Sequence, residues 1–156
     1  MQLFVKTYQQ LATSELYEIL KSRFWVFVME QQCFYLDMDN VDYRSRHVFL
    51  WDSDNFELTE QGSNNMPVVA YARLFTDSGT PNVWHIGRML TLHRKQHLGT
   101  RIMQQCIAVA RQQGCRKIEI DAQCHAIDFY KRFGFVVTSE PFDEAGIQHV
   151  KMQLIL

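Results

Sequence analysis

The amino-acid sequence predicts an α/β fold in which helices cover the faces of a mixed sheet. Segments with alternating apolar residues are separated by segments whose apolar residues have helical spacing. Gly114 and Gly134 each follow a helical segment, at the place where a glycine commonly ends a helix. The predicted order is strand, helix, three strands, helix, strand, helix and two strands. With 156 residues, the chain has the length of one ordinary domain, 1–156.

The first predicted elements are a strand and a helix. Residues Leu3–Tyr8 alternate and predict a short strand. The helix that follows is expected to have Thr13 or Ser14 as its N-cap and to end near Glu30. Residues 31–46 show no clear period, which predicts a loop with one short turn. The apolar residues at helical spacing are Leu16, Ile19, Leu20, Phe24 and Phe27.

The middle of the chain predicts three strands. The polar residues 52–66 predict a long surface loop between the first two of them. In the third strand, Trp84, Ile86 and Leu90 share one face by a period of two, with Arg88 between them. The three strands are His47–Asp52, Pro67–Phe75 and Val83–Leu92.

The period then changes from strand to helix. Leu98, Ile102, Cys106 and Val109 mark one face of a helix that runs to Gln113. The remaining predicted elements are a strand at Lys117–Ala122, a short helix over Ala126–Phe133, and strands at Phe135–Thr138 and His149–Leu154.

The composition excludes several classes of partner. The formal net charge of −1 gives no basic field for a nucleic-acid backbone, so no nucleic-acid partner is expected. No apolar run approaches the roughly 20 residues that cross a membrane. The first residues lack the basic start and apolar stretch of a signal peptide. We therefore expect a cytoplasmic protein without a membrane partner.

The chain has four cysteines, at Cys33, Cys106, Cys115 and Cys124. None forms a CxxC pair, so neither a metal site nor a redox dithiol is predicted. In a reducing compartment such cysteines are expected to be free thiols, some of them buried.

The segment Arg94–Thr100 (RKQHLGT) predicts an anion-binding turn at the start of the second long helix. The first backbone N–H groups of a helix are unpaired and favour negative charge, which suits a pyrophosphate. Gly99 allows a ligand to approach the backbone closely, and Arg94 and Lys95 add donors. A solvated basic turn with one packing glycine would show the same pattern.

A second block, Ala126–Phe135 (AIDFYKRFGF), lies after the predicted central strand. Together with Arg94–Gly99 it resembles the acyl-CoA signatures of the GNAT superfamily of N-acetyltransferases. The resemblance implies the GNAT fold, a mixed and mostly antiparallel sheet that is splayed at its centre, with helices on both faces. Further segments resemble the ElaA-like subgroup, namely Arg23–Asp42, Ala70–Arg73, Ile86–Arg88 and Gly146–His149.

Two residues of the first block depart from the family pattern. His97 and Lys95 stand where the family commonly has glycine. A helix N-terminus can still bind phosphates without a glycine at position 97, provided that the backbone φ there is negative.

The resemblance implies an enzyme that transfers an acetyl group from acetyl-CoA to a small-molecule or peptide amine by direct attack. Tyr130 would then protonate the leaving thiolate, since tyrosine stays protonated at neutral pH. The strand before the loop would bind pantetheine through its backbone, near Leu90, and supply the oxyanion donor. The implied CoA-binding residues are Leu90, Thr91, Leu92, Arg94, Lys95, Gln96, His97, Leu98, Gly99, Thr100, Gln123, Phe129 and Tyr130.

Several residues are candidates for the general base that deprotonates the amine. Glu30 and His47 are two of them, and Glu119 and Asp121 on the central strand are two others. A chain of water molecules could also serve this purpose.

Two arginines, Arg73 and Arg88, lie within apolar strands. A buried arginine needs an ionic partner, so we expect pairing with Asp37, Asp39 or Asp42.

Two other functions fit the same residues. A non-catalytic CoA-binding sensor would use the same phosphate turn. An acyl-homoserine lactone synthase would share the fold and a similar N-terminal stretch, although such enzymes are usually longer. Many GNAT proteins are dimers, so a homodimer is among the expected assemblies.

Overall fold

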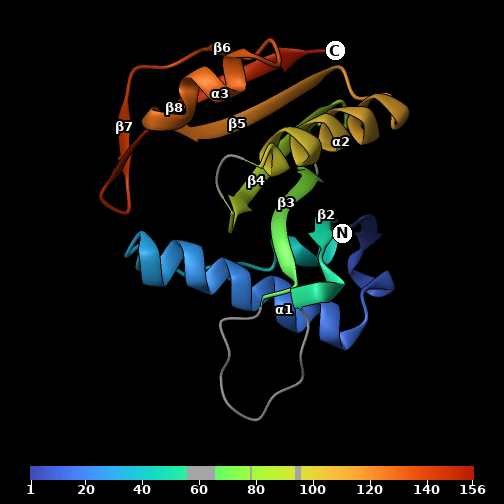
Figure 1. The fold of residues 1–156 in the computed structure, drawn as a ribbon. Coiled ribbons are helices and arrows are strands. Elements are labelled where there is room, and N and C mark those ends of the chain that lie inside the picture. Colours follow the sequence, from blue (N-terminus) through green and yellow to red (C-terminus); the bar gives the residue numbers. More distant parts are fainter. Residues whose placement is uncertain (56–65, 78, 94–95) are drawn as a thin grey trace.

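In the computed structural model, the described residues are 1–55, 66–77, 79–93 and 96–156. Within these ranges eight strands form one sheet in the order β1-β2-β3-β4-β5-β8-β6, with β7 paired to β8 (Figure 1). Most of the loop predicted at 52–66 lies outside the described residues. The strands are β1 (Gln2–Thr7), β2 (Arg46–Trp51), β3 (Val68–Thr76), β4 (Val83–Thr91), β5 (Lys117–Gln123), β6 (Val136–Val137), β7 (Phe142–Glu144) and β8 (Ile147–Ile155).

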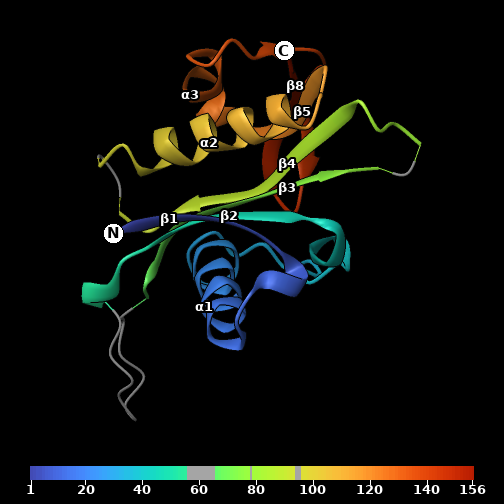
Figure 2. The same ribbon diagram turned by 90° about the vertical axis from the view of Figure 1, so that its right-hand side faces the viewer.

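Helices cover both faces of this sheet, as the sequence predicts. The helix α1 (Thr13–Arg23) lies on one face, and α2 (Leu98–Gln112) and α3 (Ile127–Lys131) lie on the other (Figure 2). The apolar face predicted for α2 is buried, and Ile102 and Cys106 are fully inaccessible. Gly114 follows α2 with a φ of +72°, a conformation that glycine adopts without strain. No helix in the described ranges is long and apolar enough to cross a membrane.

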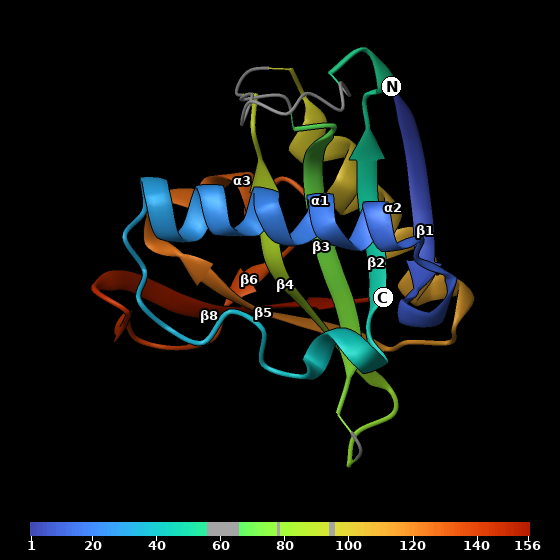
Figure 3. The same cartoon turned by 90° about the horizontal axis from the view of Figure 1, so that it is seen from below.

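The first helix differs from its prediction at its start, whereas its helical conformation ends at Glu30 as predicted. Ala12, not Thr13 or Ser14, is the N-cap, because the Glu15 carboxylate accepts a hydrogen bond from the Ala12 N–H at 2.9 Å. After Arg23 the chain continues as a π-helix, η2 (Phe24–Glu30). Together α1 and η2 cross beneath β2, β3 and β4 (Figure 3). The loop that follows contains one 3₁₀ turn, η3 (Val41–Arg44), as expected.

A bulge in β4 changes which side chains share a face. Arg73 is paired with Gly87, whereas Tyr71 is paired with Leu90, so β4 has one extra residue at this place. Arg88 accommodates the extra residue with a φ of +54°. Ile86 consequently packs in the α2-side core and Leu90 in the α1-side core. The prediction that these two residues share a face is therefore wrong.

The sheet is splayed at its centre, as the family resemblance implies. The strands β4 and β5 are parallel and pair only from Val83 to His85 and from Lys117 to Glu119. Beyond the pair His85 and Glu119, β4 leaves β5, and β5 continues its pairing with β8 on the other side.

At the C-terminal end the sequence analysis missed the strand β7. It is only three residues long, and it forms a hairpin with β8 through Ala145 and Gly146, which both have positive φ. Short polar strands of this kind have no hydrophobic alternation to reveal them.

Candidate active site

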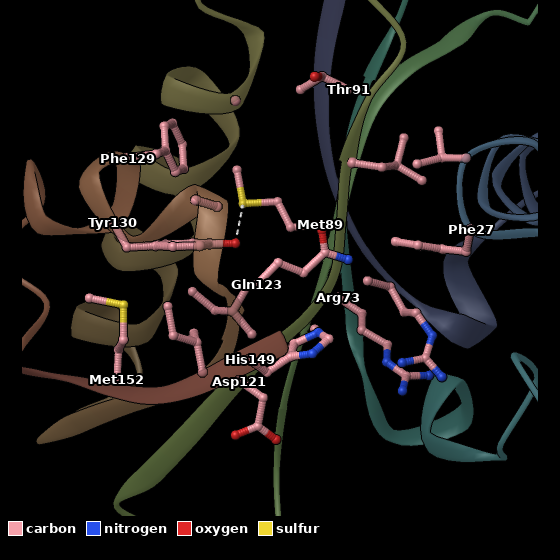
Figure 4. A pocket seen from close by; sticks show the side chains of 18 of the residues that line it. Phe27, Arg73, Met89, Thr91, Asp121, Gln123, Phe129, Tyr130, His149 and Met152 are labelled. Carbon is pink, nitrogen blue, oxygen red and sulfur yellow. Dashed lines mark hydrogen bonds between the residues drawn. The ribbon is translucent and has the colours of Figure 1, made fainter. Parts of the chain in front are cut away.

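The divergence of β4 and β5 opens a cleft of about 1200 Å³. Its walls come from η2, β4, the N-terminus of α2, β5, α3, the β7–β8 turn and β8. Figure 4 shows Tyr130 and Phe129 projecting from one side of this space and Phe27 from the other, with Gln123 between them. Most of the residues singled out in the sequence are therefore brought together here.

The N-terminus of α2 lines the cleft through His97, Leu98, Gly99 and Thr100. A Cβ atom on Gly99 would lie 3.4 Å from Phe129 Cζ, an ordinary van der Waals contact, so the first turn of α2 packs directly against that ring. His97 is the N-cap and has a φ of +56°, so the negative φ considered for this position is not found. The left-handed conformation explains why a glycine is common there, and histidine is one of the residues that tolerate it.

The other CoA-binding candidates near this turn are Leu92, Arg94, Lys95 and Gln96. Arg94 and Lys95 lie outside the described residues, and Gln96 is exposed and does not line the cleft. Leu92 donates its backbone N–H to Val69 of β3 at 2.9 Å, so its backbone faces away from the gap.

The backbone on the cleft side of β4 is that of Thr91. Successive residues of an extended strand point their backbone groups to opposite sides, and Leu92 points to β3. By the same alternation Leu90, which is paired with Tyr71, faces β3 and not the gap. The N–H and C=O of Thr91 therefore face away from β3 and are positioned for a ligand.

Tyr130 lies on the cleft wall formed by α3. Its hydroxyl donates to Met89 Sδ at 3.7 Å, next to the β4 bulge. Burial, with a smaller contribution from Cys106, raises the pKa of Tyr130 to about 12. The phenol therefore keeps its proton at neutral pH and can donate it to a group in the gap.

Gln123 and Gln31 join the two sides of the cleft. The Gln123 Nε2 donates to Gln31 Oε1 at 3.0 Å, and the Gln31 Nε2 donates back at 3.4 Å. Gln31 follows η2, whereas Gln123 ends β5. A ligand that bonds to the Gln123 amide would have to share or replace this contact.

The candidate bases divide into two groups. Glu30, Glu119 and Asp121 line the cleft. Each already has a partner: Glu30 accepts from Trp25 Nε1 at 2.9 Å, Lys117 lies 2.6 Å from Glu119, and Lys151 lies 3.7 Å from Asp121.

His47 lies in the protein core and not in the cleft. Its side chain is inaccessible, its Nδ1 is 2.9 Å from the Tyr71 hydroxyl and its Nε2 is 3.0 Å from the Asp42 carbonyl. Burial lowers the pKa of this ring, so it stays neutral. The prediction of His47 as a base for a cleft substrate is therefore wrong, because both ring nitrogens are occupied and neither reaches the cleft.

Sequence reasoning missed a cleft histidine, His149 on β8. It lies directly opposite Gln123 in the β5–β8 pair and lines the cleft. Its Nδ1 is 2.8 Å from the Ile147 carbonyl, and its ring stacks on Phe142 with centroids 5.9 Å apart. Its Nε2 is 3.6 Å from the Glu144 carboxylate. A prediction that β8 pairs with β5 would have placed His149 opposite Gln123 and so at the cleft.

The expected pairing of Arg73 and Arg88 is confirmed, and a third arginine joins the network. Arg73 donates two hydrogen bonds to the Asp39 carboxylate, at 2.7 and 2.6 Å, and Arg88 Nε donates to Asp37 at 2.6 Å. Arg23 donates to Asp37 at 2.9 Å and to Asp42 at 2.7 Å. The three arginines thereby attach the loop after η2 to β3, β4 and the end of α1.

Comparisons with known proteins match this architecture. Residues 23–156 match the acetyltransferase (GNAT) domain. This chain belongs to the GNAT acetyltransferase family. ElaA of Escherichia coli is 31% identical over 93% of this chain and 90% of its own length. The crystal structure of ElaA has a TM-score of 0.83 with 28% identity, and the alignment covers 97% of each chain. The ElaA-like resemblance is thus confirmed.

Two further solved structures share this fold. An acyl-CoA N-acyltransferase from Pseudomonas aeruginosa is 28% identical with a TM-score of 0.83, over 98% of this chain and 99% of its own. An acetyltransferase from Bacillus subtilis, solved in complex with CoA, has a TM-score of 0.64 with 19% identity over 99% and 98% of the two chains, a likeness in fold alone. The family binds acyl-CoA, and this GNAT domain has an open cleft at the splayed strands.

Proposed function

We propose that this chain transfers an acetyl group from acetyl-CoA to a primary amine, which attacks the thioester directly. The observation that carries the proposal is the cleft at the β4–β5 divergence, which brings the α2 N-terminus, the Thr91 backbone and the Tyr130 hydroxyl to one gap. The Bacillus subtilis protein of the same fold, solved with CoA, supports the choice of donor.

The donor would lie on the side of the gap formed by α2 and α3, which we call the donor side. Here the first turn of α2 offers unpaired N–H groups to the pyrophosphate. Phe129 and Gly99 form the adjoining wall, and Thr91 offers its backbone to the pantetheine arm. Tyr130 then lies beside the β4 bulge, where its proton can pass to the departing sulfur.

The only cysteine in the described part of the cleft wall, Cys33, does not favour a covalent acyl-enzyme. Burial, together with the nearby Glu144, raises the pKa of its thiol. A thiol that keeps its proton is a weak nucleophile. Direct attack by the amine is therefore the simpler route.

The acceptor would enter on the opposite face, which we call the acceptor side. On β5, Ile120 and Ala122 pack into the α2-side core, so the alternate residues Glu119, Asp121 and Gln123 face the other way. The carboxylates of Glu119 and Asp121, with Glu144 across the turn, give this face an acidic rim that suits a cationic amine.

The test measures thiol release from acetyl-CoA with spermidine, kanamycin and a lysine-containing peptide, together with CoA affinity by calorimetry. We expect CoA binding and acetylation of at least one amine. Tight CoA binding without turnover on any of the amines would instead favour a non-catalytic sensor. The absence of CoA binding would overturn both functions.

A further inference from the structure

We propose that His149 is the general base of the acyl transfer, with Glu144 as the group that holds the acceptor ammonium beside it. This assignment rests on the proposed function, and it names the residue that prepares the amine for attack.

The strand register places His149 at the reacting level of the gap. His85 of β4 is paired with Glu119 of β5, and four residues further along each strand are Met89 and Gln123. His149 is the direct partner of Gln123 in β8, so their side chains share a face of the sheet. Figure 4 shows the His149 ring beside Gln123, in the space between Tyr130 and Arg73. The acid Tyr130 and the proposed base His149 thus line the same cleft.

The surroundings of the ring fix its tautomer. A carbonyl oxygen only accepts hydrogen bonds, so the 2.8 Å contact with Ile147 requires the proton on Nδ1. In the neutral ring, Nε2 then has a free lone pair. Phe142 stacks on the ring at an interplanar angle of 25°, which restrains its rotation. His149 therefore presents a proton acceptor in a held orientation.

A carboxylate lies beside the ring. Glu144 on β7 lies 3.6 Å from Nε2, too far for a hydrogen bond. Its side chain is 58% exposed, so it can meet an incoming ammonium. On the same face Asp121 and Lys151 pair with each other, and across the cleft Arg73 and Arg88 are neutralised by the aspartates.

The proposed step balances as follows. The ammonium of the acceptor loses one proton to His149 Nε2, and the neutral amine forms a bond with the thioester carbon. The C–S bond then breaks, and the sulfur takes the proton of Tyr130. The second proton of the nitrogen restores the tyrosine, and His149 releases its proton to solvent. The products are the amide, CoA thiol and one proton.

The kinetic test compares His149→Ala and His149→Gln with the wild type on the amine that the wild type acetylates fastest. We expect kcat/KM to fall about 10²-fold or more, with CoA affinity unchanged. The decline of the wild-type rate toward acidic pH should disappear, and added imidazole should restore part of the activity of His149→Ala. Gln148→Ala is the matched control, since Gln148 precedes His149 on β8 but is exposed and does not line the cleft.

Several outcomes would overturn the assignment. His149→Gln with activity within threefold of the wild type and an unchanged acid limb would exclude the base role while leaving the proposed function intact. A wild type without turnover would remove the proposed function itself. A measurement independent of activity is the ¹⁵N spectrum of His149 in the wild type. We expect the Nδ1–H tautomer, and an Nε2–H tautomer would contradict the proposal.

Discussion

The donor and acceptor sides of the gap are built in different ways. The donor side comes from two short stretches of sequence, the start of α2 and the helix α3, and it uses backbone groups, a glycine and one phenol. The acceptor side is assembled from η2, the loop after it, and the strands β3, β4, β5, β7 and β8. Charged side chains that are far apart in the sequence hold it together. Local motifs therefore define the donor, whereas tertiary pairing defines the acceptor.

The largest expected effect concerns the charges of the acceptor side. Replacing Arg23 with alanine leaves Asp37 and Asp42 without a guanidinium that is itself inaccessible to solvent. Asp37 keeps Arg88 and Asp42 keeps Arg73 as partners, but three aspartates then face only two arginines. We expect the free energy of unfolding to fall by about 3–5 kcal/mol, because removing the inaccessible guanidinium leaves one carboxylate of the network uncompensated. Urea denaturation followed by circular dichroism measures this change.

The matched control is Arg44→Ala. Arg44 pairs with Asp77 at 3.1 Å, and both side chains are more than half exposed. The loss there should not exceed about 1 kcal/mol. Equal losses in the two variants would show that the network contributes no more than a surface pair.

On the donor side, Tyr130→Phe is expected to lower kcat about 10²-fold while CoA affinity changes little. The substitution removes the hydroxyl that donates to Met89 but keeps the ring that packs on Phe129. Steady-state kinetics and calorimetry separate the two quantities. Tyr17→Phe is the control, since Tyr17 is 65% exposed on α1. Loss of CoA binding in place of turnover would make Tyr130 a packing residue.

A third prediction concerns how the free energy of unfolding changes at acidic pH through the aspartates of the acceptor side. Burial alone would raise the pKa of Asp39, but the hydrogen bonds and charge of Arg73 lower it to about 2. A carboxylate with a lowered folded pKa stabilises the fold above its unfolded pKa of about 3.9, and this contribution is lost as the pH falls toward 2. Because Asp39 is partly exposed, we expect a loss of about 1 kcal/mol over this range. Asp39→Asn should flatten the stability profile there, and an unchanged profile would contradict the pairing.

The same division explains what the sequence could predict. The element order, the splayed sheet, the burial of α2 and the pairing of Arg73 and Arg88 follow from periodicity, family motifs and the cost of a buried charge. The β4 bulge, the π-helix and the strand β7 could not be predicted, since each depends on tertiary contacts and leaves no periodic signal.

The two buried histidines show this limit most directly. His47 and His149 both lie on strands, and nothing in their neighbouring residues separates them. The tertiary surroundings determine whether each ring reaches the cleft. Tyr71 and the Asp42 carbonyl enclose His47, whereas His149 lies opposite Gln123 at the gap. Residue type and local pattern do not contain that information.

The smallest effect concerns the one position where the donor side departs from the family pattern. Because His97 has a φ of +56°, His97→Gly and His97→Ala should differ in a direction opposite to ordinary helix propensity. We expect the glycine variant to be more stable by about 1 kcal/mol, since alanine carries the Cβ penalty of the left-handed region. Thermal unfolding of the two variants measures the difference. The control pair is Thr100→Gly and Thr100→Ala in the first turn of α2. At that position the alanine variant should be the more stable. If alanine is also the more stable residue at position 97, the backbone there is right-handed, and the phosphate turn then has the negative φ that needs no glycine.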